Sequence, residues 1–312
     1  MSLKKKFLLK RLSWRADDLN DYCGPLVHRQ FVESLAHADM YCLIRAAAEA
    51  VGGADIIFLQ KQPQYIATFQ NPFVSSQAIA YHVGAHSTLL ATSWDTYFKG
   101  KRSAKTRRRL KEKFSALSKL GQVDMRIVDS IPEATRLVEI CLDLKAGQLR
   151  KLGHRNPFHS SGARALLVDY FGSRIAEDTW VAALYVSGQP AAIAFGFRDR
   201  ESWLLYQTAM TGGRLGNLSP GTHLLMHVIK HCCEHGVRVF DLSLGDEHYK
   251  TEWCEQTTPL MTDVVGISTL GRLFSHCIRA KSTISRWISS KPALYEIAKR
   301  TKGRLGSMRH PT

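Results

Sequence analysis

The sequence predicts an α+β protein in which helices flank a mixed sheet. Residues 179–210 contain three apolar runs separated by turn signals at Ser187-Gly188 and at 199–201, a pattern typical of an antiparallel meander. A glycine-rich loop at 211–218 follows, then a helical pattern, then another apolar run that begins at Val237. The order strand, strand, strand, loop, helix, strand is that of a mixed α+β sheet.

The remaining elements follow from local patterns along the chain. Before the meander we expect helices at 31–51, 94–120, 132–152 and 161–177, and strands at 55–60, 65–69 and 123–128. The meander strands are expected at 179–186, 190–198 and 203–210, followed by a helix at 220–234 and strands at 237–243 and 260–268. Pro220 suits the first turn of its helix and Gly236 its end. These patterns divide the chain into an N-terminal part at 1–120, a C-terminal domain at 121–270 and a basic tail at 271–312.

The formal net charge of +16 predicts an anionic partner: a nucleotide cofactor, an acidic membrane surface or a nucleic acid. The cations gather in a block at 99–113 and in the tail beyond Gly271. Few aromatic residues lie among the cations of the first block, so few side chains could stack on nucleic-acid bases. We therefore do not expect a nucleic acid as partner. The tail mixes apolar residues with cations, which fits a helix in contact with an anionic membrane or a helix docked on the protein body.

Cysteine usage and hydropathy bear on the compartment. The seven cysteines include no CxxC pair, which favours reduced thiols over a disulfide framework. No apolar run is long enough to cross a bilayer, and the basic N-terminal residues lack the apolar stretch and cleavage site of a signal peptide. We therefore expect a cytoplasmic protein, with peripheral attachment to the inner face of the membrane as the alternative that the tail offers.

The turn at 216–222 is the first candidate site. A Ser-Pro-Gly turn that opens a helix presents free N–H groups and the positive end of the helix dipole, both suited to a phosphate. The residues expected to bind the phosphates of a cofactor are Gly216, Ser219, Pro220, Gly221 and Thr222. Such a turn also starts ordinary helices, but the surrounding order of strand, loop, helix and strand favours a binding site.

The helix that follows carries three histidines at a spacing of four, His223, His227 and His231. Residues at this spacing share one helix face, and two such histidines can bind zinc. The sequence contains no HExxH motif at this position, so we expect no metal and interpret the histidines as a polar stripe beside the cofactor.

Several segments together resemble a known superfamily. They are SPGT at 219–222, VFDL at 239–242 and GDEHYKTEW at 245–253, supported by GQPAA at 188–192, KTRRRL at 105–110 and NPF at 71–73. These segments resemble the GNAT acyltransferases, most closely the cellulose-biosynthesis (CelD-like) acetyltransferases related to the FemAB aminoacyl-transferases. The resemblance implies a GNAT-like mixed sheet flanked by helices, in two GNAT-like halves of which the first is incomplete. It also implies acetyl-CoA or a longer acyl-CoA as co-substrate.

The end of the 237–243 strand and the loop after it form the second candidate site, with Asp241, Asp246, Tyr249 and Lys250. Acyl transfer needs a base for the acceptor proton and an acid for the departing thiolate. Asp246 or Asp241 fits the base and Tyr249 the acid, while Lys250 fits an oxyanion or an acidic acceptor. In the structural alternative, Asp246 caps the following helix and Lys250 pairs with a neighbouring glutamate. The resemblance adds an acceptor side at Lys145, Gln207 and Trp253.

The resemblance implies an enzyme that transfers an acyl group, other than an aminoacyl group, from acyl-CoA to an amine or hydroxyl. We expect direct attack by the acceptor in a ternary complex, because no cysteine has surroundings that suit a nucleophile. We expect the acceptor to come from polysaccharide (cellulose or exopolysaccharide) or cell-envelope biosynthesis, such as a sugar or polysaccharide precursor. Three alternatives stay open. They are N-acylation of a sphingoid-type lipid amine at the membrane, FemAB-like aminoacyl transfer from tRNA, and a non-catalytic scaffold that binds acyl-CoA.

Overall fold

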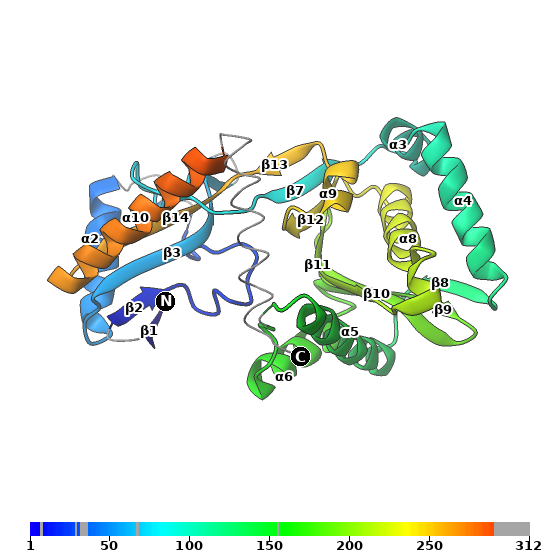
Figure 1. Ribbon diagram of the computed structural model, residues 1–312, viewed down its shortest axis with the longest axis horizontal. Coiled ribbons are helices and arrows are strands. Elements are labelled where there is room, and N and C mark those ends of the chain that lie inside the picture. Colours follow the sequence, from blue (N-terminus) through cyan, green and yellow to red (C-terminus); the bar gives the residue numbers. More distant parts are fainter. Residues whose placement is uncertain (7–8, 29, 32–36, 67–68, 155, 290–312) are drawn as a thin grey trace. The chain divides into compact units, whose positions relative to one another are not determined.

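The computed structural model describes residues 1–6, 9–28, 30–31, 37–66, 69–154 and 156–289 (Figure 1). These residues form two compact units. Unit 1 comprises Met1–His82 together with the described residues from Pro259 onward, and unit 2 comprises Val83–Thr258. All the candidate site residues lie in unit 2.

Unit 1 is built on a five-stranded sheet. The strand order is β1 (Ser2–Lys6), β2 (Leu9–Ser13), β3 (Ile56–Pro63), β14 (Leu260–Gly266) and β6 (Ile79–Ala80), and β4 (Tyr65–Ile66) pairs separately with β5 (Phe69–Gln70). Helix α2 (His37–Ala50) supplies Met40, Ile44 and Ala48, spaced four apart on one helix face, to the core of this unit. Helix α10 (Thr269–Ser289) packs on β14 and β3.

Unit 2 is built on a seven-stranded sheet. Its order is β13 (Gln256–Thr258), β7 (Ala85–Leu89), β12 (Val239–Leu244), β11 (Ser202–Met210), β10 (Gln189–Arg198), β9 (Thr179–Val186) and β8 (Val123–Ile127). Neighbouring strands are antiparallel except β11 and β12, which are parallel. The sheet is therefore mixed, as predicted.

Helices cover both faces of this sheet (Figure 1). Helix α8 (Pro220–Glu234) packs on β9, β10 and β11 from one face. Helix α5 (Ile131–Lys151) packs on the same three strands from the opposite face, where it lies beside α6 (Ser161–Ser173). Strand β9 is buried along its whole length, which explains its uninterrupted apolar sequence. Trp180, Ala182 and Leu184 share one core with the buried face of α8. The mixed sheet flanked by helices confirms the predicted fold class.

A bulge between β10 and β11 sets which side chains face which helix. A side chain at Gly196 would place its Cβ 1.8 Å from the carbonyl oxygen of Leu204, so only glycine fits there. Beyond this point Gln207 pairs with Phe195, whose ring packs 4.8 Å from Phe171 of α6. Since paired residues point to the same face of a sheet, Gln207 lies on the face covered by α5 and α6.

The helix expected at 94–120 is divided in two. Helix α3 (Trp94–Lys101) ends at Arg102, and α4 (Ala104–Ser118) begins after Ser103. The hydroxyl of Ser103 accepts a hydrogen bond from the N–H of Thr106 at 3.2 Å, which is the bond of an N-cap. The apolar spacing continues across the break, so periodicity alone did not indicate it.

Two strands lie where the predicted boundaries do not place them. The strand expected at 260–268 is β14, but it pairs with β3 and β6 in the sheet of unit 1. In exchange, β7 from the N-terminal part pairs with β12 and β13 in the sheet of unit 2. The compact units therefore change at residues 83 and 258, whereas the predicted boundaries are at 120 and 270.

The basic tail begins as α10, which is docked on unit 1. Arg279 donates hydrogen bonds to the carbonyl oxygens of Gln77 at 2.6 Å and Val264 at 2.7 Å. Leu273, Phe274 and Ile284 of the same helix are exposed. The side chains of 285–289 and the whole of 290–312 lie outside the described residues, so part of the predicted interfacial helix does too. No helix in the described ranges has the length and apolar character needed to span a bilayer.

Candidate active site

The two parallel strands of unit 2 diverge along their length. β11 and β12 pair through Ser202, Trp203 and Leu204, which lie opposite Val239, Phe240 and Asp241. Beyond this register β11 continues to Met210, paired with β10, and β12 continues to Leu244, paired with β7. Asp246, Tyr249 and Lys250 follow the end of β12, Asp241 lies within β12, and the candidate phosphate turn follows the end of β11. The two strands no longer pair beyond Leu204 and Asp241, which leaves a splay between them.

The end of β12 is held by a buried lysine. Ser243 adopts a left-handed conformation with φ of 62°, and its N–H donates to the carboxylate of Asp241 at 2.6 Å. The ammonium of Lys250 donates to the carbonyl oxygens of Leu244 at 2.5 Å and Ser243 at 3.5 Å, and pairs with Glu247 at 3.2 Å. Lys250 is only 4% exposed. These contacts match the structural alternative for Lys250, in which it pairs with a neighbouring glutamate. The carboxylate of Asp241 is engaged by the N–H of Ser243 in the turn at the end of β12.

Asp246 does not cap the helix that follows it. The N-cap of α9 (His248–Trp253) is Glu247, which makes no side-chain cap bond. Asp246 Oδ1 instead accepts from His86 Nε2 at 3.1 Å and from the N–H of Gly84 at 3.4 Å. The carboxylate is 55% exposed, so a substrate can approach its other oxygen.

His86 is a site residue that the sequence did not indicate. Its side chain is only 6% exposed, and its second ring nitrogen, Nδ1, lies 3.1 Å from the hydroxyl of Thr257. A neutral imidazole can donate from Nε2 to the carboxylate while Nδ1 accepts from the threonine hydroxyl. His86 and Thr257 face each other because β7 pairs with β13, and His86 is 160 residues away from Asp246 in sequence.

Tyr249 is partly buried against the core of unit 2. Burial raises the pKa of its phenol well above the ordinary value of 10.0, and the nearby Glu247 adds to the effect. Tyr249 therefore stays protonated at neutral pH and can donate a hydrogen bond to a developing negative charge.

The cysteines near this site are not poised as nucleophiles. Burial raises the pKa of the Cys254 thiol to about 12 and that of Cys233 to about 11. A thiol with so high a pKa contains very little thiolate at neutral pH, and the thiolate is the reactive form. This chemistry favours direct attack over a cysteine-bound intermediate.

The phosphate turn has fewer free backbone donors than its sequence suggests. Ser219 is left-handed, with φ of 58°, and its hydroxyl does not cap α8. The N–H groups of Leu218, Ser219 and Thr222 donate within the chain, and Pro220 has none. A Cβ on Gly216 would lie 2.9 Å from the carbonyl oxygen of Thr211, so glycine is required there.

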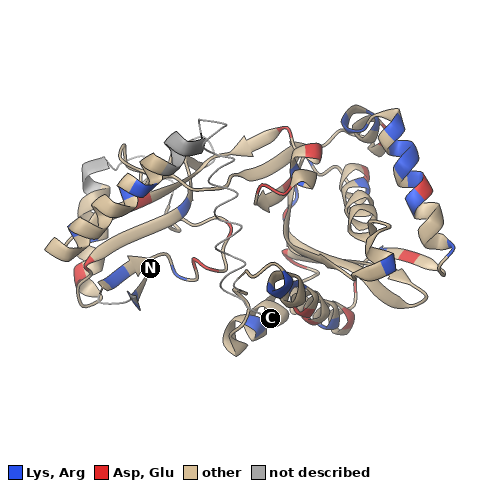
Figure 2. Ribbon diagram, in the orientation of Figure 1, with Lys and Arg blue, Asp and Glu red and all other residues tan. Residues whose placement is uncertain are grey.

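Lys113 supplies a positive charge at this turn. Its ammonium donates to the hydroxyl of Ser219 at 2.7 Å, joining α4 to the start of α8. Lys113 belongs to the dense run of basic residues along α4 (Figure 2). A lysine ammonium beside a helix N-terminus is well suited to a phosphate group. The sequence shows Lys113 as one cation of the basic block and gives no sign that it lies at the turn.

The residues expected on the acceptor side have different surroundings. Cys141 Sγ contacts the carbonyl oxygen of Ile193 at 3.9 Å, and Gln148 donates to the carbonyl oxygen of Met210 at 3.1 Å. Lys145 lies between these two residues on α5, on the helix face directed at β10 and β11. It therefore shares the α5 face of the sheet with Gln207.

Trp253 is a core residue in this structure. It is 1% exposed, its ring stacks with Tyr97 at 6.2 Å, and the Arg102 guanidinium lies 4.1 Å above it. A side chain buried in this way cannot contact an acceptor without repacking of the core, and it fixes the orientation of α9 instead.

The histidines of α8 are buried or half-buried. His223 is buried against Phe114 at 5.3 Å, and burial lowers the pKa of His223, His227 and His231. Within the described residues, no group of three or more His, Cys, Asp or Glu side chains is arranged to hold a metal ion.

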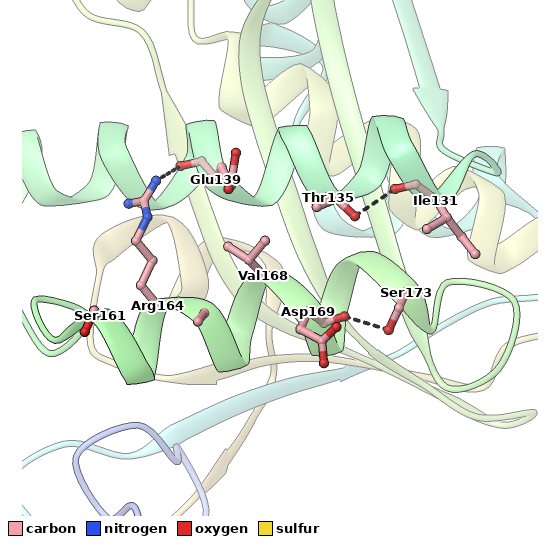
Figure 3. A pocket seen from close by; sticks show the side chains of 9 residues that line it. Ile131, Thr135, Glu139, Ser161, Arg164, Val168, Asp169 and Ser173 are labelled. Carbon is pink, nitrogen blue, oxygen red and sulfur yellow. Dashed lines mark hydrogen bonds between the residues drawn. The ribbon is translucent and has the colours of Figure 1, made fainter.

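A cavity of about 540 Å³ between α5 and α6 lies apart from this site (Figure 3). Thr135 and Ser173 bond to carbonyl oxygens of their own helices, and Arg164 bonds to the carbonyl of Glu139 and to Asp143. These polar groups already have partners. The cavity is a groove between two packed helices, and Glu139 and Asp169 are the carboxylates among its lining residues.

Comparison with family models finds a match to one part of the chain. A family model described as Acetyltransferase (GNAT) domain matches residues 104–251, from α4 to α9. This part of the chain, somewhat less than half of it, therefore matches a GNAT acetyltransferase domain, and it lies wholly within unit 2. A search of curated proteins found no match.

Solved structures resemble the chain in fold. The crystal structure of FemX is 10% identical with a TM-score of 0.53, covering 89% of this chain and 85% of that chain. The C-terminal domain of a candidate lysylphosphatidylglycerol synthetase from Agrobacterium fabrum is 15% identical with a TM-score of 0.50, covering 78% and 76%. At these identities the likeness is one of fold alone. The CelD-like branch is not among the matches that these comparisons describe.

Proposed function

We propose that unit 2 transfers an acyl group from acetyl-CoA or a longer acyl-CoA to an amine or hydroxyl acceptor. The observation that carries this proposal is the joint position of three features in one GNAT domain. They are the splay of β11 and β12, the Lys113–Ser219 contact after β11, and the exposed Asp246 carboxylate after β12. Bound acyl-CoA would supply an activated thioester. Ser219 and Lys113 would hold its pyrophosphate, with Gly216, Pro220, Gly221 and Thr222 shaping the turn around it.

Asp246 is the base in this proposal. Its Oδ2 accepts the proton of the attacking amine or hydroxyl while the acceptor lone pair adds to the thioester carbonyl carbon and the C–S bond breaks. His86 and Gly84 hold Oδ1 and so fix the direction of the other oxygen. Asp241 is the less suited base, because the turn at the end of β12 already uses its carboxylate.

Tyr249 stabilises the departing sulfur in this proposal. A phenol with a raised pKa is a poor source of a free proton, but it donates a hydrogen bond to a thiolate. The proton taken up by Asp246 then returns to the thiolate through solvent. Lys250 contributes by holding the strand end from which Asp246 and Tyr249 are presented.

The acceptor is proposed to bind on the α5 side of β11, beside Lys145 and Gln207. An acceptor from polysaccharide or envelope biosynthesis is the first candidate, and a lipid amine is the second. Exposed apolar residues and cations on α10 support a peripheral contact with an anionic membrane, which would bring the enzyme to a lipid acceptor.

Aminoacyl transfer is a second candidate function. The basic face of α4 supports it, since an aminoacyl-tRNA is a polyanion, and a solved structure of similar fold is the candidate lysylphosphatidylglycerol synthetase. In this candidate function the transferred group is an aminoacyl group. A scaffold that binds acyl-CoA without catalysis is the third, and the presence of both Asp246 and His86 weighs against it.

The test is thiol release with purified full-length protein, using acetyl-CoA, longer acyl-CoAs and a panel of amine and hydroxyl acceptors. We expect acceptor-dependent release of CoA thiol. Transfer from aminoacyl-tRNA without any thiol release would replace this proposal by the second candidate. Binding of acyl-CoA without turnover of any acceptor would favour the scaffold.

A further inference from the structure

A second cavity in unit 2 lies between α4 and α8, and residues of α3 also line it. Its volume is about 310 Å³, at the lower end of the range of about 300–1,000 Å³ for small-molecule sites. Trp94, Phe98 and Phe114 form much of its wall, and the rings of Trp94 and Phe98 stack 4.7 Å apart with planes 13° apart. Flat aromatic walls suit a planar, unsaturated ring.

The charged groups around this cavity are all positive. Arg107, Lys111 and Lys230 line it, and none of its lining residues is a carboxylate. The Arg107 guanidinium is fixed by a bond to the carbonyl oxygen of Arg102, and Lys111 is exposed at the surface. The cavity therefore favours a ligand that combines an apolar planar group with an anion.

One residue that lines this cavity has a buried ring nitrogen without a partner in the described part of the chain. His223 is 4% exposed, and its Nε2 has no hydrogen-bond partner among the described residues. The ring bonds to the carbonyl of Leu218, and burial lowers the pKa of His223, so the imidazole is neutral and Nε2 is an acceptor. A buried polar atom without a partner is costly, so a ligand that donates a hydrogen bond here would be stabilised.

The cavity adjoins the phosphate turn. Phe114 and His223 contact each other in its wall. Phe114 follows Lys113 on α4, and His223 lies one turn after Ser219 on α8, while Lys113 and Ser219 are hydrogen-bonded to each other. A phosphate held at Lys113 and Ser219 is thus continuous with a planar group held in the cavity.

We propose that this cavity binds the adenosine 3′-phosphate end of the acyl-CoA, an inference that rests on the proposed function. The purine ring lies against the aromatic wall, its exocyclic amine donates to His223 Nε2, and the 3′-phosphate meets Lys111 and Arg107. The donor is then held at its nucleotide end by a cavity of α4 and α8, and at its thioester end by the splay of the sheet.

The experiment is calorimetric binding of CoA and two of its fragments to the full chain. The fragments are 4′-phosphopantetheine and adenosine 3′,5′-bisphosphate. We expect CoA to bind at least about tenfold more tightly than 4′-phosphopantetheine, and the bisphosphate to bind by itself. Lys111→Glu should remove most of the gain from the nucleotide and leave 4′-phosphopantetheine affinity within about twofold. Arg109→Glu is the matched control, an exposed cation on α4 outside the cavity.

The outcomes separate this inference from the proposed function. If 4′-phosphopantetheine binds as tightly as CoA, or if Lys111→Glu and Arg109→Glu act alike, the adenosine site is wrong while the acyltransferase proposal stands. If neither CoA nor 4′-phosphopantetheine binds, the proposed function is wrong, and the adenosine site that depends on it is wrong as well. Binding of an aminoacyl-tRNA in the absence of any CoA binding would overturn both.

Discussion

His86 Nε2 lies 3.1 Å from Asp246 Oδ1, although the two residues are 160 positions apart in the chain. The buried imidazole spans from Thr257 on β13 to the carboxylate that follows β12. This contact fixes the orientation of the Asp246 carboxylate, because Oδ1 is held by His86 while Oδ2 remains available to a substrate.

Replacement of His86 by glutamine should lower kcat about tenfold, because a positioned hydrogen bond to the base is lost. Affinity for acyl-CoA should stay unchanged, since His86 does not contact the phosphate turn. Thr257→Ser, which keeps the hydroxyl, should behave as the wild type, and Thr257→Val should resemble His86→Gln. The exposed His248→Gln is the control. If His86→Gln alters acyl-CoA affinity and leaves kcat intact, the positioning role is wrong.

Replacement of Lys113 by methionine should weaken acyl-CoA binding about tenfold by removing a charge-assisted contact with phosphate. The remaining affinity should depend less on salt, because one ion-pairing group is gone. Lys105→Met, at an exposed position in the first turn of the same helix, should change neither quantity. Calorimetry at two salt concentrations measures both, and equal losses in the two variants would contradict a specific site.

Acidification should destabilise unit 2 through the histidines of α8. The pKa of His223, His227 and His231 is lowered from 6.5 in the folded state, so the unfolded chain binds more protons as the pH falls below that value. The free energy of unfolding should therefore decrease as the pH falls below about 6.5, with the buried His223 contributing more than the half-buried His227 and His231.

Urea denaturation between pH 7.5 and 5 would measure this effect. His223→Gln should reduce the slope of stability against pH, whereas His248→Gln, at an exposed side chain, should not. A stability that rises on acidification would show that the histidines are charged in the folded state.

Trp253→Ala should cost about 3–5 kcal/mol of unfolding free energy, the usual price of emptying a large aromatic site in a core. Trp253→Phe keeps a ring beside Tyr97 and Arg102, so it should retain most of the stability and leave the KM for the acceptor unchanged. A raised acceptor KM in the stable Trp253→Phe protein would restore Trp253 to the acceptor site.

Local patterns predicted the elements that carry strong local signals. The meander at 179–210 follows from fully buried apolar strands separated by tight turns, and α8 from Pro220 at its first turn and the stop at Gly236. The break at Ser103 was missed because the apolar spacing of α3 continues into α4, and only the cap bond to Thr106 reveals it.

The contacts between distant segments could not be predicted in the same way. Periodicity does not encode which strand pairs with which, so the exchange of β7 and β14 between sheets was missed. His86 and Lys113 reached the site through such long-range contacts, and neither sits in a motif of its own. Lys250 and Trp253 sit in the motif, but their burial gives them structural surroundings that sequence alone does not show.

The most direct test of the central claim is the behaviour of Asp246→Asn in acceptor-dependent thiol release, measured beside its affinity for acyl-CoA. A carboxamide keeps the shape of the side chain but cannot take up the acceptor proton. We predict that acyl-CoA affinity remains within about twofold of the wild type while turnover falls about a hundredfold or more, as expected for loss of a general base. Wild-type turnover in Asp246→Asn, or a wild-type protein that binds no acyl-CoA, would contradict the account.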